Sequence, residues 1–273
     1  MSTYTEQSRR KVTTTRIREM KAAGEKIACL TAYDFTMARL VDAAGVDFIL
    51  VGDSAANVMM GYETTLPITL DDMITFARGV VRGVERALVV VDLPFGYYQG
   101  CPDKALESAV RIMKETGASA VKLEGGAEIR ESVERILAAG IPVCAHLGLT
   151  PQSVNQFGGY GVRAKGDSEA RKLIENAELL QSLGCFALVL EKIPAALANE
   201  VTARLSIPTI GIGAGSGTDG QILVVQDMLG MNEGFKPKFM RHFGQIGQAV
   251  TAAVGSYVGE VKNVTFPSDS ECY

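Results

Sequence analysis

The feature that most constrains the fold of this chain is an alternation of short apolar strands with amphipathic helices, which begins at Lys26 and runs almost to the end. The strands are apolar runs, and the helices carry apolar residues at spacings of three and four. About eight such units predict an α/β fold, a (β/α)8 TIM barrel. The predicted strands span residues 26–33, 47–52, 87–91, 119–123, 141–145, 186–190, 208–212 and 222–225.

The predicted helices are placed by apolar stripes and by glycines that end them. They cover residues 35–44, 70–82, 102–116, 128–139, a segment that begins at Asp167, 194–205 and 237–258. Residues 1–25 are predicted as an N-terminal capping helix and residues 262–273 as a polar tail. The whole chain, residues 1–273, is expected to form a single barrel domain.

The seventh unit fits the barrel least well. Only about ten residues separate its strand from the next, whereas a parallel crossover usually needs a dozen or more. A truncated helix is therefore expected between them. An open doubly wound sheet is the alternative fold, but no GxGxxG motif follows the first strand, as a dinucleotide-binding sheet would require.

Composition excludes several classes of function. The formal net charge of −4 argues against a nucleic-acid partner, because phosphate neutralisation needs clustered Lys and Arg. No apolar run approaches the roughly 18 residues of a membrane span, and no hydrophobic segment of a secretory signal follows the N-terminus. The 5 cysteines form no CxxC pair and are odd in number, which is typical of reduced thiols. We therefore expect a cytoplasmic protein.

Charged and polar residues gather at the carboxyl ends of the predicted strands. In a (β/α)8 barrel these ends meet at one mouth, where active sites lie. Groups of this kind carry a desolvation penalty unless they are paired or bound to a metal. The candidate site residues are Asp53, Ser54, Asp92, Lys122, Glu124, His146 and Glu191.

Three of these residues are carboxylates on neighbouring strands. Asp53, Asp92 and Glu124 would repel one another at one side of the mouth, and a divalent cation would remove that conflict. Ligands that are all oxygen favour a hard ion, Mg²⁺ first. The alternative is three acids that are separately capped or salt-bridged.

A metal with open positions could chelate a 2-oxo acid and acidify the carbon next to its ketone. Lys122 would add positive charge at the same oxygen. Glu191 is the candidate base, with a helix cap or ion pair as the alternative role. His146 is a candidate donor to a substrate oxygen or a structural residue, whereas His242 is expected on the surface or in packing of the last helix.

The ordered motifs of this chain resemble the ketopantoate hydroxymethyltransferase family. The most specific are HLGLTPQ at residues 146–152 and FGGY at residues 157–160. The others are VGDS at 51–54, DLPF at 92–95, VKLEGG at 121–126, LE at 190–191, GIGAG at 211–215 and TDGQ at 218–221. The resemblance runs from about Thr13 to Val258, nearly the whole chain.

That resemblance implies a barrel of the phosphoenolpyruvate/pyruvate type, Mg²⁺ and a large homo-oligomer, commonly a homodecamer. It puts the metal on Asp53, Asp92 and Glu124 and the base on Glu191. It puts the 2-oxo acid on Ser54, Asp92 and Lys122, with Asp53 at the metal beside it; His146 matches in identity, with a less defined role.

The implied reaction transfers a hydroxymethyl group from 5,10-methylenetetrahydrofolate to 3-methyl-2-oxobutanoate. The product would be 2-dehydropantoate, a pantothenate precursor, formed through an enolate stabilised by Mg²⁺. The runner-up is a related Mg²⁺-dependent 2-oxo acid carbon–carbon lyase. Such relatives typically carry a cysteine in a mobile loop, in a lysine-glycine-lysine-cysteine stretch that this chain lacks.

Overall fold

The structure of the protein, a computed structural model, describes residues 10–232, 234 and 237–273. The chain divides into two compact units, Met1–Val224 and Val225–Tyr273. The first holds all eight strands and the candidate site. The second holds two helices, and each unit is described by itself below. A single barrel domain over the whole chain remains a prediction.

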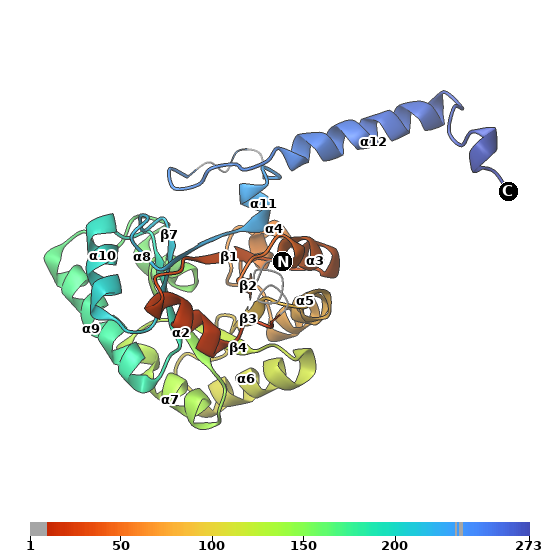
Figure 1. Cartoon of the computed structure of the whole chain (residues 1–273). Coiled ribbons are helices and arrows are strands. Elements are labelled where there is room, and N and C mark those ends of the chain that lie inside the picture. Colours follow the sequence, from red (N-terminus) through yellow and green to blue (C-terminus); the bar gives the residue numbers. More distant parts are fainter. Residues whose placement is uncertain (1–9, 233, 235–236) are drawn as a thin grey trace, which may run out of the picture. The chain divides into compact units, whose positions relative to one another are not determined.

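Eight parallel strands close into a barrel in sequence order, which confirms the predicted fold class (Figure 1). The last strand pairs with the first, with Ile222 opposite Cys29. Closure removes both sheet edges, so every strand has two neighbours. The strands are β1 (Ile27–Thr31), β2 (Phe48–Val51), β3 (Leu88–Asp92), β4 (Ala120–Glu124), β5 (Val143–Gly148), β6 (Ala187–Glu191), β7 (Thr209–Ile212) and β8 (Gly220–Leu223).

Helices connect the strands on the outside of the barrel (Figure 1). This agrees with the sequence prediction at every connection except that from β7 to β8. In α5 the stripe of Leu70, Met73 and Ile74 is buried, and Thr69 starts the helix in a capping box with Asp72. The long helices are α3 (Phe35–Ala43), α5 (Leu70–Gly83), α6 (Pro102–Thr116), α7 (Arg130–Ala138), α9 (Asp167–Leu183) and α10 (Ala195–Arg204).

A helix packs against the apolar core at the amino-terminal ends of the strands. The core cluster joins alternate residues of the strands, such as Phe48, Leu88 and Ile210, to Ile17 and Met20 of α2 (Thr14–Ala22). Burying these side chains removes apolar surface from water, at roughly 25 cal/mol per Å². The capping helix predicted over residues 1–25 is thus confirmed over Thr14–Ala22 alone: residues 10–13 and 23–25 are not helical, and residues 1–9 lie outside the described part.

The connection from β7 to β8 differs from the prediction. Residues 213–219 form a loop, so the expectation of a truncated helix is wrong. Gly213 and Gly215 both have positive φ, a conformation that breaks a helix. The side-chain amide of Gln221 donates to the carbonyl of Gly215 and to Thr218 Oγ1, which holds the short loop together.

The long predicted loops contain short helices. The loop after β2 contains α4 (Ala55–Val58). The loop after β5 contains a 3-10 turn, η2 (Pro151–Ser153), and α8 (Val154–Phe157), and a further 3-10 turn, η1 (Ala127–Ile129), precedes α7. These short turns set the direction of the chain just above the mouth of the barrel.

The second unit contains α11 (Val225–Met228), α12 (Ile246–Lys262) and a 3-10 turn, η3 (Asp269–Glu271). The last helix begins later than the predicted residue 237, because residues 243 and 246 donate backbone hydrogen bonds to the carbonyls of Met228 and Leu229. His242 therefore precedes the helix rather than lying in it. No residue of α12 is buried by the described rest of this unit.

No helix in the described residues is long and apolar enough to cross a membrane.

Candidate active site at the mouth of the barrel

Strand register brings the charged residues of the candidate site side by side. Asp92 at the end of β3 is paired with Lys122 of β4, and Glu124 of β4 is paired with His146 of β5. Paired residues of parallel strands share a face, and residues two apart along a strand share it as well. The four side chains therefore meet inside the barrel at its carboxyl end, as the strand pattern predicts.

Lys122 lies at the centre of this group. Its Nζ is 2.8 Å from Oδ1 of Asp92, 3.7 Å from Oε1 of Glu124 and 3.3 Å from Nδ1 of His146. The contact with Asp92 is an ion pair without hydrogen-bond geometry, since Oδ1 has no hydrogen-bond partner. Only 3% of Lys122 is exposed, so water does little to offset its charge. The surrounding carboxylates offset the charge of Lys122 instead.

His146 links the central group to Glu191. Its Nδ1 is 3.2 Å from Oε1 of Glu124, and its Nε2 is 3.4 Å from Oε2 of Glu191, which terminates β6. The alternative that Glu191 caps the following helix has no support here, because α10 has no side-chain cap. His146 therefore has acidic neighbours on both ring nitrogens.

Asp53 and Ser54 enter the site from the loop after β2. The backbone N–H of Asp53 donates to Oδ2 of Asp92 at 3.0 Å. Ser54 Oγ shares a hydrogen bond of 2.7 Å with the hydroxyl of Tyr33, at the end of the first strand. A Cβ at Gly52 would meet Ser54 Oγ at 2.8 Å, so glycine lets this loop turn tightly beside the acids.

Burial and charge shift the pKa values of the two aspartates upward. Burial raises the pKa of Asp53 well above its usual range, and repulsion by Glu124 and Asp92 adds to that shift. Burial also raises the pKa of Asp92, although the Lys122 ammonium opposes it. The mouth thus holds more negative charge than its own cations balance.

The other charged groups shift according to their partners. Burial alone would lower the pKa of Lys122, but the carboxylates of Asp92 and Glu124 outweigh it and raise that pKa. Burial acts against ionised Glu124, yet its contacts with His146 and Lys122 lower its pKa. Burial and Lys122 would lower the pKa of His146, but its contacts with the carboxylates of Glu124 and Glu191 raise it to about 9.

Sequence reasoning assigned no role to three residues that the structure brings to this site. Gln152, within the 146–152 motif, donates to Asp53 and to Glu124. Tyr98, with 1% exposure, accepts from the backbone N–H of Glu124. Tyr33 supports Ser54. The motif at residues 146–152 could have indicated that Gln152 belongs to the site. An isolated tyrosine in a loop has no sequence pattern that would indicate a role in the site.

The carboxylates have partners as they stand. Among the described residues, no three acidic, histidine or cysteine side chains converge on a point that could hold an ion. The donor chemistry nevertheless fits a hard cation: the three carboxylates, each at most 5% exposed, belong to one hydrogen-bonded cluster. A cation bound here would compete with Lys122 for the oxygens of Asp92 and Glu124.

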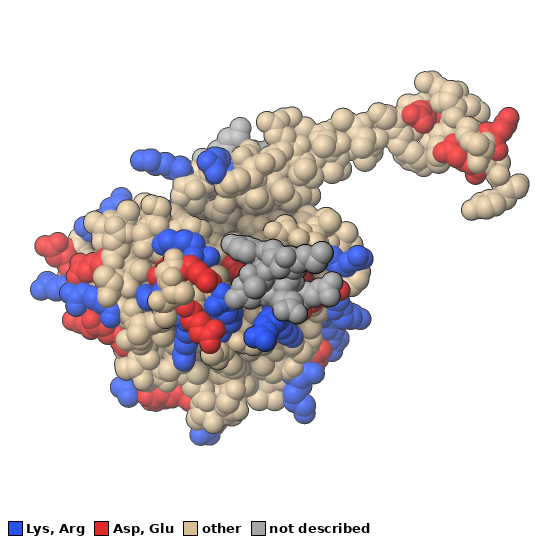
Figure 2. Space-filling model, viewed as in Figure 1, with Lys and Arg blue, Asp and Glu red and all other residues tan. Residues whose placement is uncertain are grey.

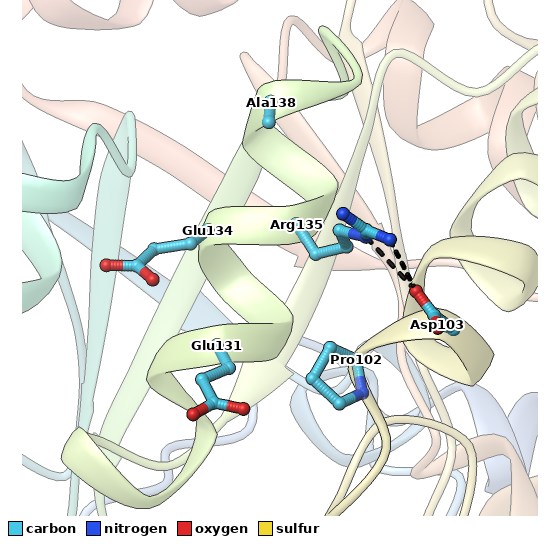
Figure 3. A pocket seen from close by; sticks show the side chains of 6 residues that line it. All are labelled: Pro102, Asp103, Glu131, Glu134, Arg135 and Ala138. Carbon is cyan, nitrogen blue, oxygen red and sulfur yellow. Dashed lines mark hydrogen bonds and ion pairs between the residues drawn. The ribbon is translucent and has the colours of Figure 1, made fainter.

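A surface groove lies away from this site, between the outer helices α6 and α7 (Figure 3). It is lined by Pro102, Asp103, Glu131, Glu134, Arg135 and Ala138. Arg135 donates to Asp103 across it at 2.8 Å. None of the predicted site residues lines this groove.

Sequence relatives identify the family. The family model described as ketopantoate hydroxymethyltransferase matches residues 11–269. The chain belongs to this family. A 3-methyl-2-oxobutanoate hydroxymethyltransferase of Parabacteroides distasonis is 62% identical over 264 residues, 97% of each chain. Relatives of that name from Porphyromonas gingivalis and Bacteroides fragilis are each 61% identical over 100% of both chains. The predicted family and hydroxymethyltransferase activity are confirmed.

Solved structures of other enzymes share the fold of this family member. The chain resembles a phosphonopyruvate hydrolase in complex with oxalate and Mg²⁺, with a TM-score of 0.61, 13% identity and coverage of 95% and 93%. It also resembles a 2,3-dimethylmalate lyase of the PEP mutase/isocitrate lyase superfamily, with a TM-score of 0.59, 17% identity and coverage of 95% and 91%. At such identities the likeness supports the barrel alone.

Proposed function

We propose that this chain transfers a hydroxymethyl group from 5,10-methylenetetrahydrofolate to 3-methyl-2-oxobutanoate, giving 2-dehydropantoate, with Mg²⁺ as cofactor. The observation that carries the proposal is the chain of contacts from Lys122 through His146 to Glu191 at the barrel mouth. It sets a buried cation beside a half-buried carboxylate. That pairing suits removal of a proton next to a ketone.

Lys122 is the residue that receives the ketone oxygen. Its raised pKa keeps the ammonium protonated, so it can donate to an oxygen that gains negative charge. Ser54 and His146 supply further donors for the 2-oxo acid, and Tyr33 holds the Ser54 hydroxyl in place. Asp53 and Asp92 complete the substrate side of the site.

Glu191 is the base that takes the proton from C3 of the substrate. The electron pair of that C–H bond then forms the new carbon–carbon bond to the one-carbon unit of the folate. Both bonds from that carbon to the folate nitrogens break. One water supplies the hydroxyl group and a proton for one nitrogen, and the proton taken by Glu191 goes to the other nitrogen, so tetrahydrofolate and 2-dehydropantoate leave. His146, 3.4 Å from Glu191, stabilises the carboxylate before the transfer.

Asp53, Asp92 and Glu124 are the residues that would hold Mg²⁺, directly or through water. The bound ion supplies positive charge near the carboxylate and ketone oxygens of the 2-oxo acid. The support from this chain is the excess of buried negative charge at the mouth. Oxygen ligands alone favour a hard ion over a transition metal.

Turnover tests the reaction directly. The purified chain, 3-methyl-2-oxobutanoate, 5,10-methylenetetrahydrofolate and Mg²⁺ should give equal amounts of tetrahydrofolate and 2-dehydropantoate. Cleavage of a 2-oxo acid substrate without folate consumption would favour the related carbon–carbon lyase. Absence of product at saturating Mg²⁺ would overturn the proposal.

Proton abstraction can be tested without the folate. The parent should exchange the C3 hydrogen of 3-methyl-2-oxobutanoate with deuterium from the solvent, detected by NMR. Glu191→Gln should exchange about 10²–10⁴-fold more slowly, the range expected for a lost general base. Glu178→Gln, which alters an outer ion pair with Arg204, is the matched control. Equal exchange in Glu191→Gln and the parent would remove Glu191 as the base.

The homo-oligomer, commonly a homodecamer in the resemblance, is part of the same proposal. Its support is the exposed apolar side of α12, where Val250, Val254 and Tyr257 face solvent. Residues 246–259 carry no charge, and Figure 2 shows this stretch of the surface without Lys, Arg, Asp or Glu colour. A second copy of the chain is the partner proposed for that face. The cytoplasmic location stays a prediction.

A further inference from the structure

Gln152 occupies an unusual position beside the candidate metal acids. It lies in the 3-10 turn after β5 and is 5% exposed. It contacts carboxylates from two different parts of the barrel: Asp53 after β2 and Glu124 at the end of β4. These strands do not pair directly, because β3 lies between them, so no backbone hydrogen bond joins the strands that carry the two acids.

All hydrogen-bonding capacity of the Gln152 side chain is used. Its Nε2 donates to Oδ2 of Asp53 at 2.9 Å and to the carbonyl of Leu93 at 3.0 Å. Its Oε1 lies 2.7 Å from the Tyr98 hydroxyl and 3.0 Å from Nε2 of Gln99, which donate to it. A flipped amide would set oxygen against oxygen at Asp53 and Leu93, so its orientation is fixed.

The same residue engages Glu124 through its backbone. The N–H of Gln152 donates to Oε2 of Glu124 at 3.0 Å, while Oε1 of Glu124 faces Lys122 and His146. Gln152 therefore donates a hydrogen bond to one oxygen of each acid, Oδ2 of Asp53 and Oε2 of Glu124. This restricts the rotation of both carboxylates and determines which oxygen each presents to the rest of the site.

A second layer holds Gln152 in turn. The Tyr98 hydroxyl also accepts from the backbone N–H of Glu124 at 3.0 Å, and the Tyr98 carbonyl accepts from Ser132 Oγ at 2.7 Å. Tyr98 is thereby tied to β4 and to α7. The result is a buried, fully bonded network, which is rigid because each member limits the others.

From this geometry we propose that Gln152, supported by Tyr98, is the positioning residue that presents Asp53 and Glu124 to the divalent cation. The inference deepens the proposed function and rests on its metal. Partners that orient metal ligands in this way change metal affinity or activity by about 10–100-fold when they are removed.

The test measures Mg²⁺ binding by titration calorimetry, apart from turnover. Gln152→Met keeps the length of the side chain but cannot donate or accept, and should raise the Kd for Mg²⁺ by about 10–100-fold. Its turnover should recover toward the parent value as Mg²⁺ is increased. Tyr98→Phe, which keeps the ring, should raise the Kd less.

Gln181→Met is the matched control. The Gln181 side chain accepts from the backbone N–H of Ser206 at 2.6 Å and of Ile207 at 3.2 Å, before β7 and hence at the opposite end of the barrel. This variant should lose stability and keep the parent Kd for Mg²⁺. A Kd that rises as much in this variant as in Gln152→Met would overturn the inference.

The remaining outcomes are also decisive. If both Gln152→Met and Tyr98→Phe bind Mg²⁺ with the same Kd as the parent protein, the positioning role is overturned. It is also overturned if the parent protein binds no Mg²⁺. If Gln152→Met does not fold, the Kd of Tyr98→Phe decides alone. A parent that binds Mg²⁺ but forms no 2-dehydropantoate would refute the proposed function, while the Kd series would still judge Gln152.

Discussion

At the scale of single residues, the site depends on a buried lysine among acids. Lys122 and Glu124 are two apart on β4, and strand alternation aims both into the barrel. Ion pairing alone would account for their burial, and in the free chain Lys122 does contact Asp92 and Glu124. The pairing and the proposed catalysis are compatible, because a cation held by acids stays charged until a substrate oxygen arrives.

Lys122→Met should destabilise the metal-free protein strongly at pH 8. Removing one partner of a buried ion pair leaves uncompensated charge and costs about 3–5 kcal/mol. The loss should shrink toward pH 5, because Asp53 and Asp92, whose pKa values burial raises, can then take up protons. Urea unfolding at both pH values measures this. Lys172→Met, at an exposed lysine, is the control; equal loss in both variants would contradict the prediction.

His146 should make the stability of the metal-free protein depend on pH. Its pKa of about 9 lies above the usual 6.5 because Glu124 and Glu191 favour the charged ring. A raised pKa means that its contribution is complete below about pH 6.5 and is lost as pH rises through about 9, on the order of 3 kcal/mol. Comparison with His146→Gln by urea unfolding should show this difference falling with pH. A pH-independent difference would contradict it.

At the scale of elements, the loop after β5 joins the two halves of the site. Its first residues follow the end of β6: the N–H of Leu149 donates to the carbonyl of Glu191 at 2.8 Å. Three residues later Gln152 reaches Asp53 and Glu124. A short turn therefore connects the proposed base with the proposed metal ligands, so its backbone conformation affects both.

Gly148→Ala should disturb this turn. Gly148 has a φ of +96°, and an added Cβ would collide with the carbonyl oxygen of Glu191. The strain should lower stability by more than about 1 kcal/mol and slow C3 exchange, since it displaces Glu191. Gly161→Ala is the control in the same loop, because nothing lies within 4 Å of its added Cβ. Equal stability and exchange in the two variants would contradict the role of the turn.

At the scale of the whole molecule, the barrel buries its own core, but α12 has no residue buried by the described rest of the second unit. Apolar residues on such a helix lose their hydrophobic stabilisation unless another surface covers them. Phe266 contacts the ring of Tyr257 edge-on at 5.6 Å, which covers only one end. This is the physical reason to expect that the protein works as an assembly of copies.

Val254→Glu should weaken that assembly. A carboxylate placed in an apolar contact pays a large desolvation penalty, so sedimentation velocity should show smaller species at equal concentration. Val264→Glu is the control, because Val264 lies beyond α12 and is already 87% exposed. A parent that sediments as a monomer would contradict the proposed homo-oligomer, and unchanged assembly in Val254→Glu would exclude this face.

Local pattern by itself determined the barrel and the residues at its mouth. Apolar runs mark the strands, and apolar stripes mark the side of each helix that is buried. Both patterns can be recognised locally, and eight repeats of the strand–helix unit predict a closed barrel. The same pattern predicted which strand ends carry charge, and family motifs added the activity. It failed at residues 213–219 and 237–245, where short loops and backbone bonds to other segments override helix signals.

Only the tertiary structure decided how the charges meet. The register of β3, β4 and β5 puts Asp92, Lys122, Glu124 and His146 in mutual contact, and register depends on the packing of the whole barrel. Gln152 and Tyr98 gain their roles in the same way, from segments far apart along the chain. Residue types and their order along the chain predicted which groups do chemistry, whereas hydrogen-bond partners across the barrel depend on distances that exist only after folding.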